Sequence, residues 1–399
     1  MATAMNNDED EAQVTITQQT FYDMGTWLSE KQQYTQTQLS RLQLEEHYLP
    51  LVALANYNWL TGALANSLKK SDVWLLIPKT LQEYLSEMER FYRQRSEAIQ
   101  QEAIFSCSLL LDADIKVSLL KGAANLFNGA ANPISNRYMS DIDLLIQESK
   151  LEDSVSTLVE NGYVNPDDDE EILIKADAHH HAPPLIRKDG ICYIELHRWA
   201  LPLSSHKILE TNEIWQQSIP LSLTPELEVL QLHPTHQIIL AIAHSEISDS
   251  AFKDNHIDLR QLFNLYSLAN NFKLQIDWTV VEHHFQRANL TEVLYSILFS
   301  IYKIFGLITP VTKIDDIDAQ KHFLSCIDLY TKTQGDNLKF GYFLQVFRGY
   351  QKQTIIDLYG NNGRYPILFG RLKHFKRHLH LLFTPKFLTR FIKRNFNKD

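Results

Sequence analysis

The stretch Arg137-Tyr138-Met139-Ser140-Asp141-Ile142-Asp143-Leu144-Leu145-Ile146 decides the fold expected for this chain. From Asp141 onward the residues form a short apolar run that is typical of a buried strand. Residues two apart in a strand face the same side, so Asp141 and Asp143 present their carboxylates to one point while Ile142 faces the core. Two oxygen ligands at this spacing suit Mg²⁺, which completes its shell with water and phosphate. The stretch therefore predicts a strand that carries a magnesium site.

A second predicted strand, Ile191 to His197, can supply a third carboxylate. Tyr193, Glu195 and His197 share one face of it, because they are spaced two residues apart. If the strand lies beside Asp141 and Asp143, three acids converge, which is costly without a cation. With one or two metals they become ligands. The alternatives are a salt-bridged strand residue for Glu195 and turn hydrogen bonds for the two aspartates.

The Asp-x-Asp spacing also occurs at Asp112-x-Asp114 and at Asp316-x-Asp318, where it predicts structural or solvated acids. Asp112 and Asp114 precede a strand instead of opening its apolar run. Asp316 and Asp318 stand at a predicted helix start, where acidic side chains are stabilising. The acidic run at 167–171 follows a proline in a predicted loop and is typical of a solvated turn.

Two groups of histidines invite a metal interpretation that the pattern does not favour. Residues 179–181 are consecutive histidines, and in a strand only His179 and His181 could converge, so a substrate-side or structural role is expected. His244, His256 and Asp258 lack a second complete ligand set. We expect helix-packing or hydrogen-bonding roles for them.

The elements around these motifs predict an α+β fold, with a mixed-sheet core between helical regions. The order in the core is strand, helix, strand, helix and then further strands, while helical periodicity dominates before it and again from about residue 225. The predicted divisions are a disordered acidic tail at 1–14, a helical N-terminal region at 15–104, the α/β core at 105–220, a helical C-terminal domain at 221–363 and a basic amphipathic tail at 364–399.

Several motifs together resemble one protein family. Leu120-Lys121-Gly122-Ala123 is followed by a polar loop and by Arg137-x-x-Ser140-Asp141-Ile142-Asp143. Further similarity lies in Glu160-Asn161-Gly162-Tyr163, in Ile194-Glu195-Leu196-His197-Arg198 and in Ile257-Asp258-Leu259-Arg260-Gln261-Leu262. Over about residues 115 to 290 the chain resembles the uncharacterised branch of the nucleotidyltransferase (polymerase-beta-like) superfamily.

The resemblance implies a nucleotidyltransferase-type core and a role for each matching residue. Asp141, Asp143 and Glu195 would be the catalytic acids and metal ligands. The predicted nucleotide-binding residues are Lys121, Gly122, Arg137 and Ser140. Gly122 stands where the superfamily has a glycine that lets the backbone approach the phosphates, although an alanine follows it here instead of a serine. Lysine and arginine both pair with phosphate.

The expected function is metal-dependent transfer of a nucleoside monophosphate from a nucleoside triphosphate, such as ATP, to a hydroxyl. Mg²⁺ or Mn²⁺ is the expected cofactor. The acceptor stays open among a small molecule, a sugar, an antibiotic and a protein side chain. An alternative is a catalytically silent nucleotide-sensing or interaction module. Another is an accessory of a surface-polymer or modified-peptide pathway.

Composition narrows the partners and the location. The formal net charge of -10 disfavours general nucleic-acid binding, which needs a positive face. The three cysteines lack paired spacing, and the N-terminus is acidic where a secretion signal would be basic and apolar, so a cytoplasmic location is expected. The tail at 364–399 interleaves basic and apolar residues, which fits peripheral contact with an anionic membrane or docking onto the protein's own acidic surface.

Overall fold

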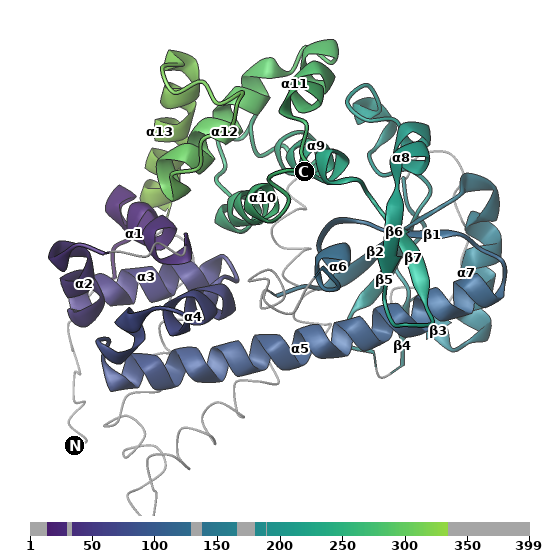
Figure 1. Ribbon diagram of the computed structural model, residues 1–399, viewed down its shortest axis with the longest axis horizontal. Coiled ribbons are helices and arrows are strands. Elements are labelled where there is room, and N and C mark those ends of the chain that lie inside the picture. The colour runs from purple at the N-terminus through teal and green to yellow at the C-terminus, as the bar shows by residue number, and fades with distance from the viewer. Residues whose placement is uncertain (1–13, 30–33, 129–137, 166–179, 189, 334–399) are drawn as a thin grey trace, which may run out of the picture.

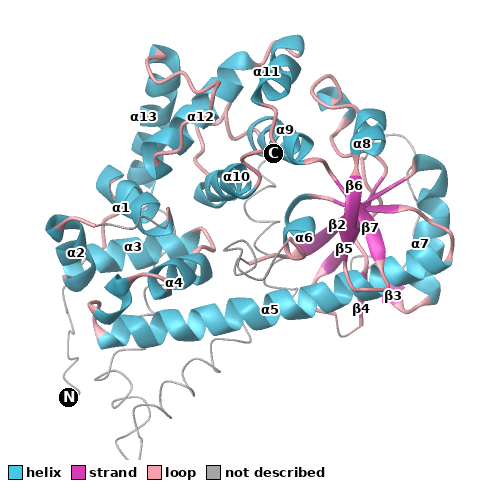
Figure 2. Ribbon diagram, viewed as in Figure 1, coloured by secondary structure: helices cyan, strands magenta, loops and turns pink. Residues whose placement is uncertain are grey.

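The computed structural model describes residues 14–29, 34–128, 138–165, 180–188 and 190–333 of the chain. Its helices and mixed sheet confirm the α+β class (Figures 1 and 2). The following predictions lie outside the described residues: the tail up to residue 13, Arg137, the acidic run at 167–171, His179, residues 334–363 of the predicted C-terminal domain and the basic tail at 364–399.

The helices expected before residue 104 are present. They are α1 (Gln18–Leu28), α2 (Gln36–Gln43), α3 (Glu45–Tyr57), α4 (Thr61–Lys69), the short 3-10 helix η1 (Asp72–Leu75) and α5 (Lys79–Asp112). α5 begins directly after Pro78, where a missing amide hydrogen costs nothing. It continues past the predicted boundary at residue 104 and runs along one edge of the molecule, from the other N-terminal helices to the sheet (Figure 1). One continuous helix therefore connects the two regions.

The main sheet is mixed, as predicted. Its strands are β1 (Val117–Leu119), β2 (Asp141–Ile146), β5 (Tyr193–His197), β6 (Ile219–Ser222) and β7 (Glu228–Gln231), in the order β5-β2-β1-β7-β6. β2 pairs with β5 in parallel and with β1 in antiparallel orientation, while β7 is parallel to β1. A small second sheet pairs β3 (Tyr163–Val164) with β4 (Ile186–Arg187). β2 is thus an inner strand with a neighbour on each side.

The sheet has one face in the core and one face toward the predicted site. Ile142, Leu144 and Ile146 of β2 belong to a buried cluster with residues of α5 and of α7 (Leu151–Glu160). Asp141 and Asp143 alternate with them and so face the other side. Around this core lie α6 (Lys121–Asn125), η3 (Glu148–Lys150), η4 (Leu203–Ser205) and α8 (Thr211–Gln217).

The expectation of helix from about residue 225 is wrong for the first residues of that region. β6 and β7 form an antiparallel pair that extends the sheet past residue 220, and β7 lies next to β1. Their length of four residues each gives little periodicity to detect, and Pro220 within β6 weakens the strand pattern. The division into domains itself stays a prediction.

Helices follow from Pro234 onward. They are α9 (Pro234–Ile242), the π-helix η5 (Ala243–Ser248), α10 (Leu259–Asn271), α11 (Trp278–Arg287), α12 (Thr291–Phe305) and α13 (Ile317–Lys332). Asp316 caps α13 by accepting from the Asp318 backbone amide, so this Asp-x-Asp is a helix start as expected. Asp258 caps α10 in the same way.

The N-terminal and C-terminal helices share one hydrophobic core. Phe21 of α1 and Phe323 of α13 are buried in the same cluster, and α1 contacts α12. Gly25 of α1 lies so near α12 that a Cβ atom there would be 1.8 Å from the Ile304 carbonyl oxygen. The helices that precede the sheet in the sequence are therefore packed against the helices that follow it.

No helix among the described residues is both long and apolar enough to span a bilayer. The apolar run from Leu294 to Ile308 falls largely within α12, whose residues are mostly buried. The cytoplasmic location and the membrane contact of residues 364–399 stay predictions.

Candidate active site

The register of β2 and β5 brings the predicted acids to one side of the sheet. In this parallel pair Asp143 lies beside Glu195, and Asp141 lies beside Tyr193. Ile142 and Ile194, one position away, are fully buried on the opposite face. All three carboxylates predicted as metal ligands therefore face the same way, next to one another.

Asp143 is the most tightly held of these acids. The Lys121 ammonium, at the start of α6, donates a hydrogen bond of 2.8 Å to Asp143 Oδ1. His197 Nε2 lies 2.8 Å from the same oxygen and 3.5 Å from Glu195 Oε2. Asp143 is 5% exposed and His197 is 1% exposed. The site thus brings together two carboxylates, an imidazole and an ammonium, of which Asp143 and His197 are buried and Glu195 and Lys121 are partly exposed.

These contacts make the acids electrostatically unequal. Burial raises the pKa of Asp141 to about 7, and the nearby Asp143 and Glu195 charges add to that rise. Burial also acts to raise the pKa of Asp143, but Lys121 and His197 outweigh it and hold this pKa below its ordinary value. Against the same effect of burial, His197 lowers the pKa of Glu195. The site is therefore short of positive charge mainly at Asp141.

His197 is the functional candidate to which sequence reasoning gave no role. Although its Nε2 is close to two carboxylates, neither ring nitrogen makes a hydrogen bond of ordinary geometry to a described residue. Ligand atoms of Asp143, Glu195 and His197 lie within 4.8 Å of one another. Two carboxylates and a buried imidazole in this arrangement fit a divalent cation. The available signal was its position two residues after Glu195, on the same strand face.

A cleft of about 170 Å³ lies beside these acids. Of the predicted residues Asp141 and Asp143 line it, as do the predicted nucleotide-binding residues Lys121, Gly122 and Ser140, whereas Glu195 is not among its described lining residues. Arg137 lies outside the described part of the chain. Residues of the C-terminal helices α9 and α10 also line the cleft. One wall of the cleft therefore comes from the α/β core and the other from these helices.

The helical wall adds polar groups that were not predicted as site residues. Arg260 of α10 and His244 of η5 line the cleft. Arg260 belongs to the stretch 257–262, one of the motifs on which the family resemblance depends. Its positive charge could therefore have been singled out from the sequence. His244 Nδ1 lies 3.2 Å from Asp249 Oδ2, which supports the hydrogen-bonding role expected for it.

His180 and His181, the described histidines before β5, lie beside the His197 ring. His181 pairs with His197 through an antiparallel bridge, and the ring centroids of His180 and His197 are 5.3 Å apart. Burial, together with the neighbouring histidines, lowers the pKa of His180 to about 3, so its ring is neutral at physiological pH. His180 and His181 therefore pack beside the carboxylate cluster, in line with a substrate-side or structural role.

Comparison with known proteins gives one family match. The model of a family described as an uncharacterised nucleotidyltransferase matches residues 45–306, more than half of the chain. The matched segment includes β2, β5 and the helices that line the cleft. No curated protein matches the chain.

Proposed function

The chain belongs to this uncharacterised nucleotidyltransferase family, and on that premise we propose that it transfers a nucleoside monophosphate from a nucleoside triphosphate to an acceptor hydroxyl. The observation that carries the proposal is the register of β2 and β5, which sets Asp143 beside Glu195 next to the cleft. The acceptor oxygen forms a bond to the α-phosphorus, the bond from that phosphorus to the bridging oxygen breaks, and pyrophosphate leaves. The hydroxyl proton passes to Glu195.

Asp141, Asp143 and Glu195 would hold Mg²⁺ or Mn²⁺, and His197 would join them. The bound cation neutralises charge on the phosphates and on the reacting oxygens. The three carboxylates are the kind of ligand that suits both Mg²⁺ and Mn²⁺. Burial and the two neighbouring acids raise the pKa of Asp141, so a cation at this position would be stabilised.

Positive groups around the cleft would bind the triphosphate. Lys121 lies at the boundary between the acids and the cleft, and Arg260 lies on the helical wall. Gly122 lines the cleft, where a residue without a side chain lets phosphate approach the backbone. Arg137 and Ser140 remain proposed nucleotide ligands. Nucleic acid stays a disfavoured acceptor because of the net charge of -10.

One observation favours a second candidate, a nucleotide-binding module without turnover. The ammonium of Lys121 already satisfies Asp143 Oδ1, so this carboxylate can be stable without a metal. A module of this kind would bind nucleotide in the cleft without transferring it. The two candidates differ in whether nucleotide is consumed.

The experiment has two stages and a matched control. The four nucleoside triphosphates are first tested with Mg²⁺ or Mn²⁺ for thermal stabilisation, because a specific ligand raises the unfolding temperature. Labelled nucleotide is then incubated with candidate acceptors, with wild type, Asp143→Asn and Asp112→Asn. Asp112 is an exposed acid of another Asp-x-Asp motif.

The proposal predicts stabilisation by at least one nucleotide and metal-dependent transfer of label. Asp143→Asn should lower transfer by roughly 100-fold or more, as expected for loss of a group that stabilises the transition state. Asp112→Asn should transfer like wild type. Undiminished transfer by Asp143→Asn contradicts the catalytic assignment. Stabilisation without any pyrophosphate release favours the silent module.

A further inference from the structure

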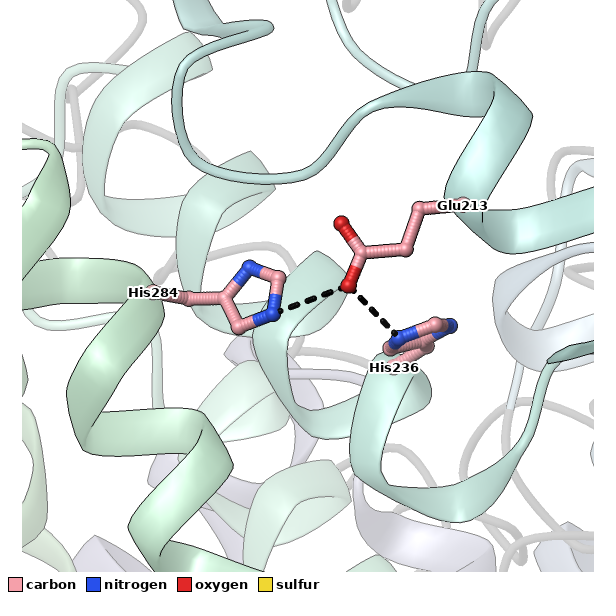
Figure 3. Close-up of side chains that lie close together, drawn as sticks. All are labelled: Glu213, His236 and His284. Atoms are coloured by element: carbon pink, nitrogen blue, oxygen red, sulfur yellow. Dashed lines mark ion pairs between the residues drawn. The ribbon is translucent and has the colours of Figure 1, made fainter.

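A second group of metal-type side chains lies outside the cleft. Glu213 of α8, His236 of α9 and His284 of α11 point toward one another from three helices (Figure 3). None of the three is among the described residues that line the cleft. His236 is fully buried and His284 is 3% exposed, while the Glu213 side chain is 26% exposed. The group is therefore closed on the imidazole side and reachable from solvent through the carboxylate.

The distances match those between the ligands of one small ion. Glu213 Oε1 lies 3.2 Å from His284 Nε2 and 3.7 Å from His236 Nε2. Ligand atoms of the three residues lie within 4.8 Å of one another. Bonds of about 2.0–2.1 Å at tetrahedral angles place zinc ligands about 3.3 Å apart. Small side-chain adjustments would bring all three onto one ion.

The orientation of His284 makes its Nε2 available as a ligand. Its Nδ1 lies 2.6 Å from the Ile208 carbonyl oxygen. The Arg287 guanidinium, which only donates, is 3.1 Å from the same nitrogen and 3.3 Å from the same carbonyl. The carbonyl contact is the shorter one, and because a carbonyl oxygen only accepts, we assign the hydrogen to Nδ1, which leaves the lone pair of a neutral ring on Nε2. That lone pair is directed at Glu213 Oε1. A histidine that donates its other N–H to a backbone carbonyl is the usual arrangement of a metal-binding imidazole.

His236 gives the independent observation that points to a ligand. Its ring is fully buried, yet neither ring nitrogen has a hydrogen-bond partner among the described residues. The separation of 3.7 Å from Glu213 is too long for a hydrogen bond. A buried polar group without a partner is costly, and native proteins rarely keep one without a reason. A cation between His236 and Glu213 would satisfy it.

We propose that Glu213, His236 and His284 bind one zinc ion that connects α8, α9 and α11. Two imidazoles and one carboxylate are a known zinc ligand set, whereas Mg²⁺ prefers oxygen ligands. The fourth position belongs to water, on the exposed side of Glu213. The ion would stabilise the position of α9, which carries His236. Gln237, the residue after His236 in α9, lines the cleft. The proposal rests on these contacts alone and does not depend on the proposed function.

The competing explanation is an ion pair without metal. Arg287 lies 3.6 Å from Glu213 Oε2, and a protonated His284 could pair with Oε1. This explanation leaves His236 unsatisfied. It also predicts that zinc has no effect on these residues, so zinc binding separates the two.

The test uses the full chain, stripped of metal with a chelator and then supplied with zinc. Bound zinc is counted at equilibrium with saturating Mg²⁺ present, and the unfolding temperature is measured with and without zinc. The variants are Glu213→Gln, His236→Phe and the control Glu210→Gln, which removes an equal charge from an exposed neighbour. Each comparison is repeated in Asp143→Asn, so that zinc at the strand acids is not counted.

Wild type and Glu210→Gln should bind one zinc ion more than Glu213→Gln or His236→Phe, with affinity at least roughly 10–100-fold higher. Zinc should raise the unfolding temperature of the first two only. The metal-free unfolding temperature shows whether each variant folds. The proposal is overturned if both site variants keep the extra zinc ion and its stabilising effect, or if wild type binds no zinc that Glu213→Gln lacks.

Discussion

Two clusters in this protein are both built from carboxylate and imidazole side chains. We call them the strand cluster (Asp143, Glu195 and His197) and the helix cluster (Glu213, His236 and His284). The strand cluster comes from neighbouring positions on two paired strands and lies beside a cleft, with Lys121 and Asp141 around it. The helix cluster comes from three helices, and none of its members lines the cleft among the described residues. A metal in the first can meet a substrate, whereas a metal in the second meets only protein and water. On the two proposals made above, similar ligands would serve chemistry in one region and packing in the other.

The largest expected effect on stability comes from Asp143→Asn in metal-free protein. The change leaves the Lys121 ammonium and the buried His197 without their carboxylate partner. Breaking a buried pair from one side costs roughly 3–5 kcal/mol, and we expect a loss at the lower end because Lys121 is partly exposed. Denaturant unfolding with a chelator measures it. A loss as small as that of Asp112→Asn, expected within about 0.5 kcal/mol, would show that the pair contributes nothing.

Asp141→Asn should separate activity from stability. The raised pKa of Asp141 follows from burial and from two neighbouring acids, so removing its charge relieves repulsion in the absence of metal. Nucleotide transfer should be lost while the metal-free unfolding temperature stays the same or rises. The same two measurements on Asp143→Asn provide the contrast. Destabilisation by Asp141→Asn equal to that of Asp143→Asn would mean that the two acids are held alike.

Glu213→Gln should show the reverse separation. Because Glu213 lies away from the cleft, nucleotide transfer at a temperature where the variant is folded should stay within about threefold of wild type, while stabilisation by zinc is lost. Initial rates and unfolding temperatures, both with and without zinc, measure the two effects. Abolition of transfer in folded Glu213→Gln would place the helix cluster in the chemistry and remove the distinction between the clusters.

The smallest expected effect concerns Glu246, an acid of neither cluster. Burial raises its pKa from 4.5 to about 7, with Asp258 and Asp249 adding to the rise and Ser245 opposing it by a hydrogen bond. At a pH between these two pKa values, the Glu246 carboxylate therefore takes up a proton when the protein folds. The resulting stability is fully present below about pH 4.5 and is lost as the pH rises through about 7.

Glu246→Gln should remove that part of the pH dependence. Compared with the variant, wild type should lose stability between about pH 5 and about pH 8, in denaturant unfolding without metal. Parallel pH profiles for the two proteins would show that burial alone does not raise the pKa of a carboxyl group in this region. Burial could then not be named as the main cause of the raised pKa of Asp141.

The sequence predicted those parts of the site that depend on local pattern. The strand at 141–146 and the faces of Asp141, Asp143 and Glu195 follow from the apolar run and the period of two. The contact of Lys121 with Asp143 depends on how α6 leaves β1, which no local pattern specifies. This contact decides the sign of the stability change, because repulsion between the two aspartates alone would make Asp143→Asn neutral or stabilising.

The features that sequence reasoning missed depend on contacts between residues far apart in the chain. β7 has its place because it pairs with β1, more than a hundred residues earlier in the chain. The helix cluster combines residues from three separate helices, and each residue alone has an ordinary sequence context. Only the packing of α8, α9 and α11 brings their side chains together.

Anomalous scattering from one crystal tests the contrast between the two clusters most directly. The crystal would contain the full chain with one equivalent of Zn²⁺, a large excess of Mn²⁺ and a non-hydrolysable nucleoside triphosphate, with data collected at the absorption edge of each metal. We predict a manganese peak between Asp143 and Glu195, in contact with the triphosphate, and a zinc peak among Glu213, His236 and His284. A nucleotide bound without metal at the strand acids, or with its metal elsewhere, would contradict the assignment of that cluster as the catalytic centre.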